Sequence, residues 1–262
     1  MQILNRQSYT QAELEEAQAF LRERLRNEYS MENDVEGLLE EYAERLLILL
    51  LRDASQEEIN ALVDELAAQL LEDCEILAAD EHDRKDEILA YIGEDRNGDN
   101  LQGRIGKRCK TFYNEVFAVF MAGKLLGKSS EAIVTSIREN LKNPWSNPIL
   151  DEVRESIEHG KVAGNIDDYA MPHFGQGVEI SSFGALKTIT RYAIADGWMW
   201  WGYTDAKAQG AKGFYVQRGS TFPCSPCDDA VAHGFYPIEE EIPVPVHLNC
   251  CCIIIYSYTE RL

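Results

Sequence analysis

Five of the seven cysteines in this 262-residue chain lie close together near the C-terminus, and their spacing constrains the fold more than any other feature. Residues 224–227 read Cys-Ser-Pro-Cys, and residues 250–252 are three consecutive cysteines. A histidine, His247, stands before the second group and gives it the spacing His-x-x-Cys. Two such pairs, about twenty residues apart, can close a tetrahedron of ligands around Zn²⁺.

The predicted metal ligands are therefore Cys224, Cys227, His247 and Cys250. Side chains alternate along an extended segment, so Cys250 and Cys252 should share one face, and Cys252 competes with Cys250 for the fourth position. Four protein ligands leave no water on the metal, so we expect a structural zinc ion and not a catalytic one. Such an ion would add folding free energy that a small unit lacks.

Other chemistries also use cysteines at this spacing. Disulfides are disfavoured because the N-terminus has no apolar signal segment, and thiols stay reduced in the cytosol. Thioredoxin-like redox chemistry requires Cys-x-x-Cys to open a helix and to form a thiolate. We expect Pro226, inside the motif, to oppose the helix, and the carboxylates of the two following aspartates to raise the thiol pKa. Zinc deaminases share Pro-Cys-x-x-Cys but need an upstream His-x-Glu, which this sequence lacks. Buried free thiols without a metal remain an open alternative.

The first half of the chain is predicted to be helical, because apolar residues recur there at intervals of three and four. Capping boxes at residues 10–13 and 55–58 mark two helix starts. The expected helices run from Thr10 to about Tyr29, after Asp34, after Ser55, over 85–92, over about 107–126, after a cap at Ser129 or Ser130, from Pro148 and from Ser182 towards Ala208. Two β-rich runs, 214–217 and 253–258, flank the cysteines.

These patterns predict a mainly α N-terminal region followed by a small α+β C-terminal unit stabilised by zinc. We expect an acidic helical region over 1–160 and an α+β domain over 161–262, since a glycine-containing irregular stretch begins at residue 160. The segment 93–106 contains four glycines and is predicted to be a loop, which places an internal boundary there.

The charge of the chain is strongly negative and unevenly distributed. The formal net charge is −20, and residues 1–100 hold 27 acidic and 9 basic side chains. Such a surface repels nucleic-acid phosphates, so we do not expect direct binding to nucleic acid. It is either a solvated face or a docking face for a basic partner. No apolar run is long enough to predict a membrane span.

Residues of about 185–256 resemble the C-terminal domain of the phage Mu F-like minor head proteins, also described as phage head morphogenesis proteins. The matching features, in order, are Thr190-Arg191, Gly210, the aromatic run 214–216, the Cys-x-x-Cys at 224–227 followed by Asp228-Asp229, and the proline-rich approach 243–246 to the cysteines of 250–252. Two positions depart from the family pattern: Leu248 replaces a proline and Cys251 replaces an arginine.

The resemblance implies a structural protein with no enzymatic activity. It implies a minor component of a phage or prophage virion, assembled in the bacterial host cytoplasm, that contacts capsid or portal proteins during head morphogenesis. The sequence contains neither a P-loop nor a nucleophile–base motif. Two alternatives from other classes are a zinc-stabilised nucleic-acid-binding module and an enzyme of the toxin-domain type.

Overall fold

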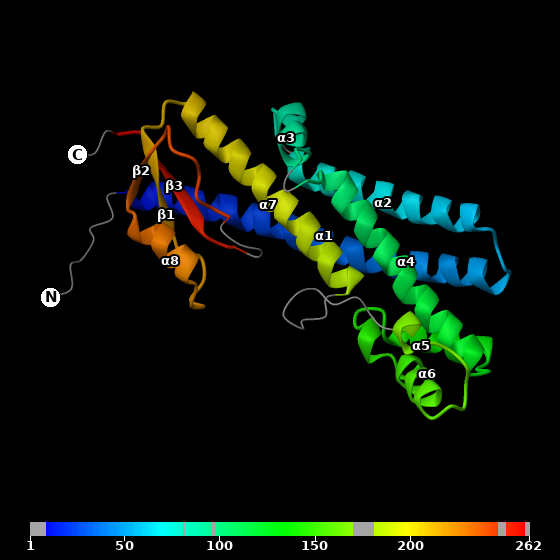
Figure 1. Ribbon diagram of the computed structural model, residues 1–262. Coiled ribbons are helices and arrows are strands. Elements are labelled where there is room, and N and C mark those ends of the chain that lie inside the picture. Colours follow the sequence, from blue (N-terminus) through cyan, green and yellow to red (C-terminus); the bar gives the residue numbers. More distant parts are fainter. Residues whose placement is uncertain (1–8, 81, 96–97, 170–180, 246–249, 260–262) are drawn as a thin grey trace. The chain divides into compact units, whose positions relative to one another are not determined.

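A computed structural model describes residues 9–80, 82–95, 98–169, 181–245 and 250–259 (Figure 1). Over these residues the chain is mainly helical, with a three-stranded antiparallel sheet near the C-terminus. The predicted fold class, mainly α with a small α+β C-terminal part, is confirmed.

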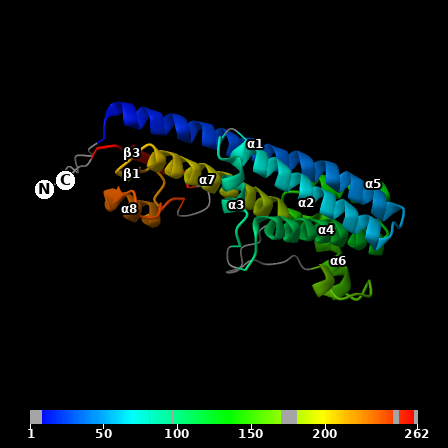
Figure 2. The same ribbon diagram turned by 90° about the horizontal axis from the view of Figure 1, so that it is seen from above.

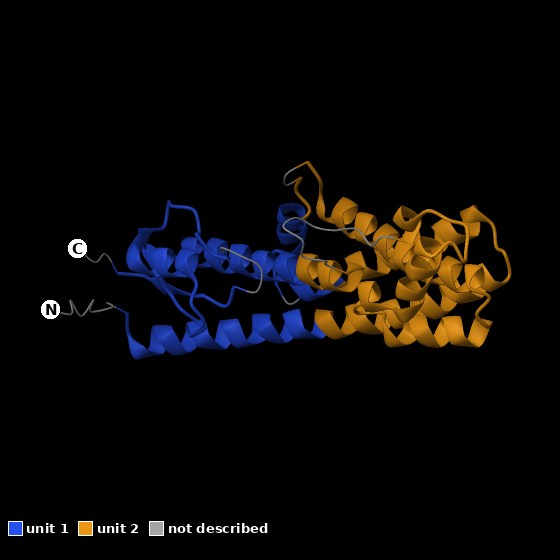
Figure 3. Cartoon of the chain, turned by 60° about the horizontal axis from the view of Figure 1, so that its bottom comes forward, with its two compact units in different colours: residues 1–30, 74–92, 191–262 blue, residues 31–73, 93–190 orange. Residues whose placement is uncertain are grey.

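The chain divides into two compact units (Figure 3). Unit 1 comprises residues 1–30, 74–92 and 191–262, and unit 2 comprises residues 31–73 and 93–190. These units do not follow the expected sequence division at residue 160, because each takes segments from both sides of that residue. The acidic first hundred residues therefore contribute to both units.

The first two helices begin at the predicted capping boxes. Helix α1 spans Gln11–Leu51 and helix α2 spans Gln56–Ala79. At the start of α1 the Thr10 amide donates to the Glu13 carboxylate at 2.6 Å, and the Glu13 amide donates to Thr10 Oγ1 at 3.2 Å. The 55–58 box makes the same reciprocal pair of hydrogen bonds before α2. Both predicted starts are confirmed.

The predicted break between Tyr29 and Asp34 is wrong, since α1 continues through it. No glycine or proline lies between these residues, and nothing removes a helical hydrogen bond there. Met31 and Val35 are both fully buried and continue the apolar face of the helix. Asp34 is thus an interior residue of the helix and not a cap.

Helix α4 begins earlier than predicted, and the expected loop over 93–106 is partly wrong. The helix spans Leu101–Leu125, and the Asn100 side chain caps it by accepting a hydrogen bond from the Gly103 amide at 2.7 Å. Two of the four glycines lie inside the helix, because Leu101 and Ile105 are buried and start its apolar face. The cap offsets the weak helix propensity of glycine.

The remaining helices lie close to their predicted positions. They are α3 Lys85–Ile92, α5 Ser130–Glu139, α6 Pro148–Glu158, α7 Ser182–Ala208 and α8 Ser225–Ala232, with 3-10 turns at Pro144–Ser146 and Ile166–Tyr169. Of these α-helices, only α8 was not predicted. In unit 1, the first part of α1 runs alongside the second part of α7, as both views show (Figures 1 and 2).

The sheet belongs to unit 1 and carries the C-terminal core. Strand β1, Gly213–Gln217, pairs antiparallel with β2, Phe235–Pro237, on one side and with β3, Ile253–Ser257, on the other. The two predicted runs, 214–217 and 253–258, correspond to β1 and β3, whereas the short β2 was not predicted. Phe214 of β1 is fully buried and stacks on Tyr236 of β2 with ring centroids 5.0 Å apart.

A buried carboxyl, Glu115 of α4, holds the N-terminal end of α7 within unit 2. Its Oε1 accepts a hydrogen bond from the Ser182 amide at 2.9 Å, and its Oε2 bonds to the Ser182 hydroxyl. Burial raises the pKa of Glu115 from 4.5 to about 7, although the Ser182 hydrogen bonds and the charge of Arg108 act in the opposite direction. The carboxyl therefore titrates near neutral pH.

The raised pKa of Glu115 predicts a pH-dependent stability. The folded chain holds this proton more tightly than the unfolded chain, so the stabilisation is complete below about pH 4.5 and is lost as pH rises through about 7. Over that range the wild type should lose about 3 kcal/mol relative to Glu115→Gln, measured by urea unfolding. The exposed control Glu131→Gln should follow the wild type. Parallel pH curves for wild type and Glu115→Gln would contradict this account.

Candidate metal centre

The first pair of cysteines lies at the start of α8. Cys224 is the N-cap residue with an extended backbone, and Cys227 lies in the first turn, 3% exposed. Our expectation that Pro226 would keep the motif from opening a helix is wrong, because proline is well tolerated in the first helical turn. The seven-residue connection 218–224 between β1 and α8 leads to this first turn, and Cys227 lies in the core of unit 1.

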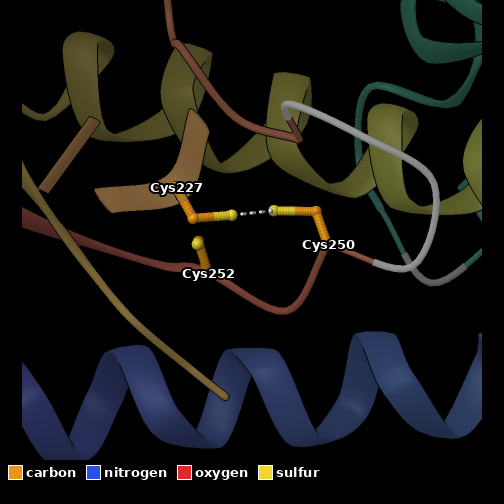
Figure 4. A group of neighbouring side chains, drawn as sticks. All are labelled: Cys227, Cys250 and Cys252. Atoms are coloured by element: carbon orange, nitrogen blue, oxygen red, sulfur yellow. Dashed lines mark hydrogen bonds between the residues drawn. The ribbon is translucent and has the colours of Figure 1, made fainter. Parts of the chain in front are cut away.

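The second group approaches Cys227 from the segment before β3. Cys250 and Cys252 are buried, whereas Cys251 between them is only partly buried. This alternation confirms the predicted arrangement of the three consecutive cysteines. The sulfur atoms of Cys227, Cys250 and Cys252 all lie within 4.8 Å of one another (Figure 4). Cys252, predicted as a competitor for Cys250, belongs to the same group.

The spacing of the sulfurs fits a metal site better than a disulfide. The Sγ atoms of Cys227 and Cys250 are 4.0 Å apart, about twice the length of an S–S bond. In a tetrahedral zinc site with Zn–S bonds of about 2.3 Å, neighbouring sulfurs are about 3.8 Å apart. None of the seven cysteines, all of which lie in the described part of the chain, forms a disulfide. The three buried thiols form a group that could hold a metal ion.

The surroundings keep the thiols of Cys227 and Cys252 protonated when no cation is present. Burial, together with the neighbouring Cys224, raises the pKa of Cys227 to about 12. A hydrogen bond with Cys250 and then burial raise the pKa of Cys252 well above its ordinary value of 9.0. Three crowded thiols cannot all ionise in an apolar core, whereas a divalent cation favours thiolate ligands and reverses that balance.

The two other predicted ligands are Cys224 and His247. Cys224 is partly buried, packs against the same core and hydrogen-bonds with Cys227. It lies outside the group of three sulfurs that are mutually within 4.8 Å. His247, predicted as a ligand, lies outside the described residues. His233, between the two cysteine groups, stacks on Tyr236 with ring centroids 3.9 Å apart.

A buried arginine that the sequence analysis missed anchors the second cysteine group. Arg24 of α1 is 1% exposed and donates from its Nη2 to the backbone carbonyl of Cys250 at 2.9 Å. Its Nε lies 3.0 Å from Glu28, and Arg191 of α7 shares that carboxylate at 3.3 Å. The available signal was an Arg–Glu pair, four residues apart, on the apolar face that begins with Phe20.

No protein-family model, curated protein or solved structure matches this chain. Among the described residues, every helix is either too short or too polar to cross a lipid bilayer.

The Arg24 contacts predict a large loss of stability in Arg24→Met. The substitution leaves the Cys250 carbonyl without this donor and Glu28 with one guanidinium fewer, at a cost of about 3–5 kcal/mol. Arg26→Met is the matched control, because Arg26 on the same helix pairs with Glu23 at the surface and should contribute less than about 1 kcal/mol. Urea unfolding followed by tryptophan fluorescence measures both variants. Equal losses would contradict the anchoring role.

Proposed function

We propose that the buried thiol group is a structural zinc site. Cys227, Cys250 and Cys252 supply three thiolates, and Cys224 supplies the fourth from the N-cap of α8. The observation that carries this proposal is the convergence of three buried sulfurs from two separate chain segments. His247, predicted as a ligand from its spacing, is the rival for the fourth position.

The chemistry of the donors supports zinc over other ions. Thiolates are soft ligands that favour zinc over calcium or magnesium, and a four-sulfur set is tetrahedral. A filled site with four protein ligands has no position for water or substrate, so its role is to hold α8 against the segment before β3. The fully buried guanidinium of Arg24, bonded to the Cys250 carbonyl, is an outer-shell partner that would partly offset the charge of the thiolates.

Elemental analysis of protein purified without added metal tests the zinc proposal. We expect about one zinc per chain in the wild type, as a single tetrahedral site requires. Cys227→Ser should lose the metal and the cooperative melting of unit 1, since ion binding contributes folding free energy. Cys251→Ser is the matched control, because Cys251 lies in the same segment but outside the sulfur group. It should keep both.

Two further variants decide the fourth ligand. Metal loss in Cys224→Ser together with retention in His247→Ala supports the four-sulfur set, and the reverse result assigns the position to His247. A folded wild-type chain that contains no metal would overturn the zinc proposal altogether.

The same segment supports a proposal about the whole chain, namely that it is a structural minor head protein of a phage or prophage. The support is the resemblance over residues of about 185–256, which includes all three cysteines of the sulfur group. On this proposal the protein is not an enzyme and acts near the portal during head morphogenesis. Its partners are capsid or portal subunits, and it is assembled in the host cytoplasm and carried in the virion.

The charge of the chain favours a protein partner over a nucleic acid. At a formal net charge of −20 the surface repels a phosphate backbone, so binding would be weak even at low salt. An acidic surface is instead complementary to a basic surface on another subunit. We therefore place the nucleic-acid-binding alternative behind the head-protein proposal.

Mass spectrometry of purified virions tests the head-protein proposal. Particles induced from a strain that carries the gene should contain this chain in few copies relative to the major capsid protein. A strain carrying Cys227→Ser should yield fewer complete heads than one carrying the Cys251→Ser control. Absence of the chain from wild-type particles, and from their assembly intermediates, would refute the assignment.

A further inference from the structure

A second site in unit 1 is a cavity of about 150 Å³ between the N-terminal part of α1, the C-terminal part of α7 and strand β3. Gly202 of α7 helps to keep it open, because a Cβ atom there would lie 3.2 Å from the ring of Phe20 and 3.5 Å from the hydroxyl of Tyr256. A cavity of this volume can enclose a molecule about the size of benzene. It therefore has room for a short alkyl chain.

The walls of the cavity are aromatic and apolar. The aromatic lining residues are Phe20, Trp201, Tyr256 and Tyr258. Phe20 and Trp201 stack with their ring planes 9° apart and centroids separated by 5.9 Å. Aromatic faces attract cations as well as apolar groups. The walls therefore suit a ligand that combines an apolar stem with a positive charge.

Three carboxylates, those of Glu13, Glu16 and Asp205, belong to the same lining. All three interact electrostatically with Tyr258, which is 43% exposed and marks the solvent side of the cavity. Burial, followed by the charges of Glu16, Asp205 and Glu13, raises the pKa of Tyr258 above its ordinary value. The cavity thus lies in a negative potential generated by side chains from two helices.

Basic side chains do not cancel this potential. Among the described residues, Arg24 is the only basic residue that lines the cavity, and its guanidinium is engaged by Glu28 and the Cys250 carbonyl. Arg84 also interacts with Asp205, but it pairs with Glu87 and does not line the cavity.

We propose that this cavity binds an organic cation, an alkyl stem that ends in an ammonium or guanidinium group. The stem packs between the aromatic rings and the charged end lies among the carboxylates at the rim. Such a cation can be a free amine or the lysine or arginine side chain of a partner protein. The cavity borders the metal site, because Cys252 belongs to both and Arg24 contacts the Cys250 carbonyl, but the aromatic rings and carboxylates that would bind the cation are not metal ligands.

Titration of the full-length protein with pentylammonium chloride and with 1-pentanol tests the proposal. The two probes have the same stem and differ in charge, and Trp201 in the cavity wall reports binding by fluorescence. We expect saturable binding of the amine at least about tenfold tighter than that of the alcohol, and weaker amine binding at high salt. An acetylated, amidated pentapeptide with a central lysine then tests a partner side chain as the source of the cation.

The variant Glu16→Gln/Asp205→Asn removes two of the three carboxylates and should weaken amine binding about tenfold while leaving pentanol binding unchanged. Glu15→Gln is the matched control, because Glu15 neighbours Glu16 on α1 but does not line the cavity. Circular dichroism and zinc content are recorded for every variant, so that loss of fold or of metal is distinguished from loss of the cation site.

Binding of both the amine and the lysine peptide supports a partner side chain as the ligand, and binding of the amine alone supports a small molecule. Equal affinity for amine and alcohol would overturn the proposal and leave an apolar cavity only. Failure of the amine to saturate at millimolar concentrations, or unchanged amine binding in the double variant, would overturn it as well.

Discussion

The rest of unit 1 is arranged around one buried cluster of three thiols. Cys227 contributes to it from the first turn of α8, and Cys250 and Cys252 contribute from the segment before β3. Arg24 of α1 fixes the carbonyl of Cys250 from the opposite end of the sequence. Helix, strand and N-terminal helix are thus joined through one polar group inside an apolar core. Without an ion, this group consists of crowded neutral thiols, which add little cohesion. With an ion, it would add a direct link between α8 and the segment before β3, beside the strand pairing and the apolar core that they already share.

Structure that depends on neighbouring residues could be predicted from the sequence, whereas structure that depends on distant contacts could not. Local features fixed by neighbouring residues were predictable: both capping boxes, the cap at Ser129, the start of α7 and the alternation of Cys250 to Cys252. The failures arose where distant contacts decide the outcome. Tyr29 to Asp34 stays helical because Met31 and Val35 are buried, and the chain at Leu101 is helical for the same reason. Arg24 was missed because its pairing with Glu28 on the apolar face indicates burial at most, and does not reveal a contact with a backbone carbonyl 226 positions away.

Distant contacts also determine the division of the chain into two units. Charge and glycine content suggested boundaries near residues 93–106 and 160, whereas compact units are defined by which segments pack together. The chain leaves unit 1 after residue 30, returns for residues 74–92 and returns again after residue 190. Within unit 1, the aromatic residues of α7 serve two purposes. Trp198 packs against Phe20 and donates to the Leu77 carbonyl, while Trp201 forms part of a cavity wall beside three carboxylates.

X-ray absorption at the zinc edge of the purified wild-type chain tests the central claim most directly, because it identifies the metal and its ligands at once. Our account predicts a bound zinc ion with at least three sulfur neighbours at about 2.3 Å. A zinc shell of oxygen and nitrogen without sulfur, or folded protein with no zinc edge at all, would contradict it. In either case the convergence of Cys227, Cys250 and Cys252 would be core packing and not a metal centre.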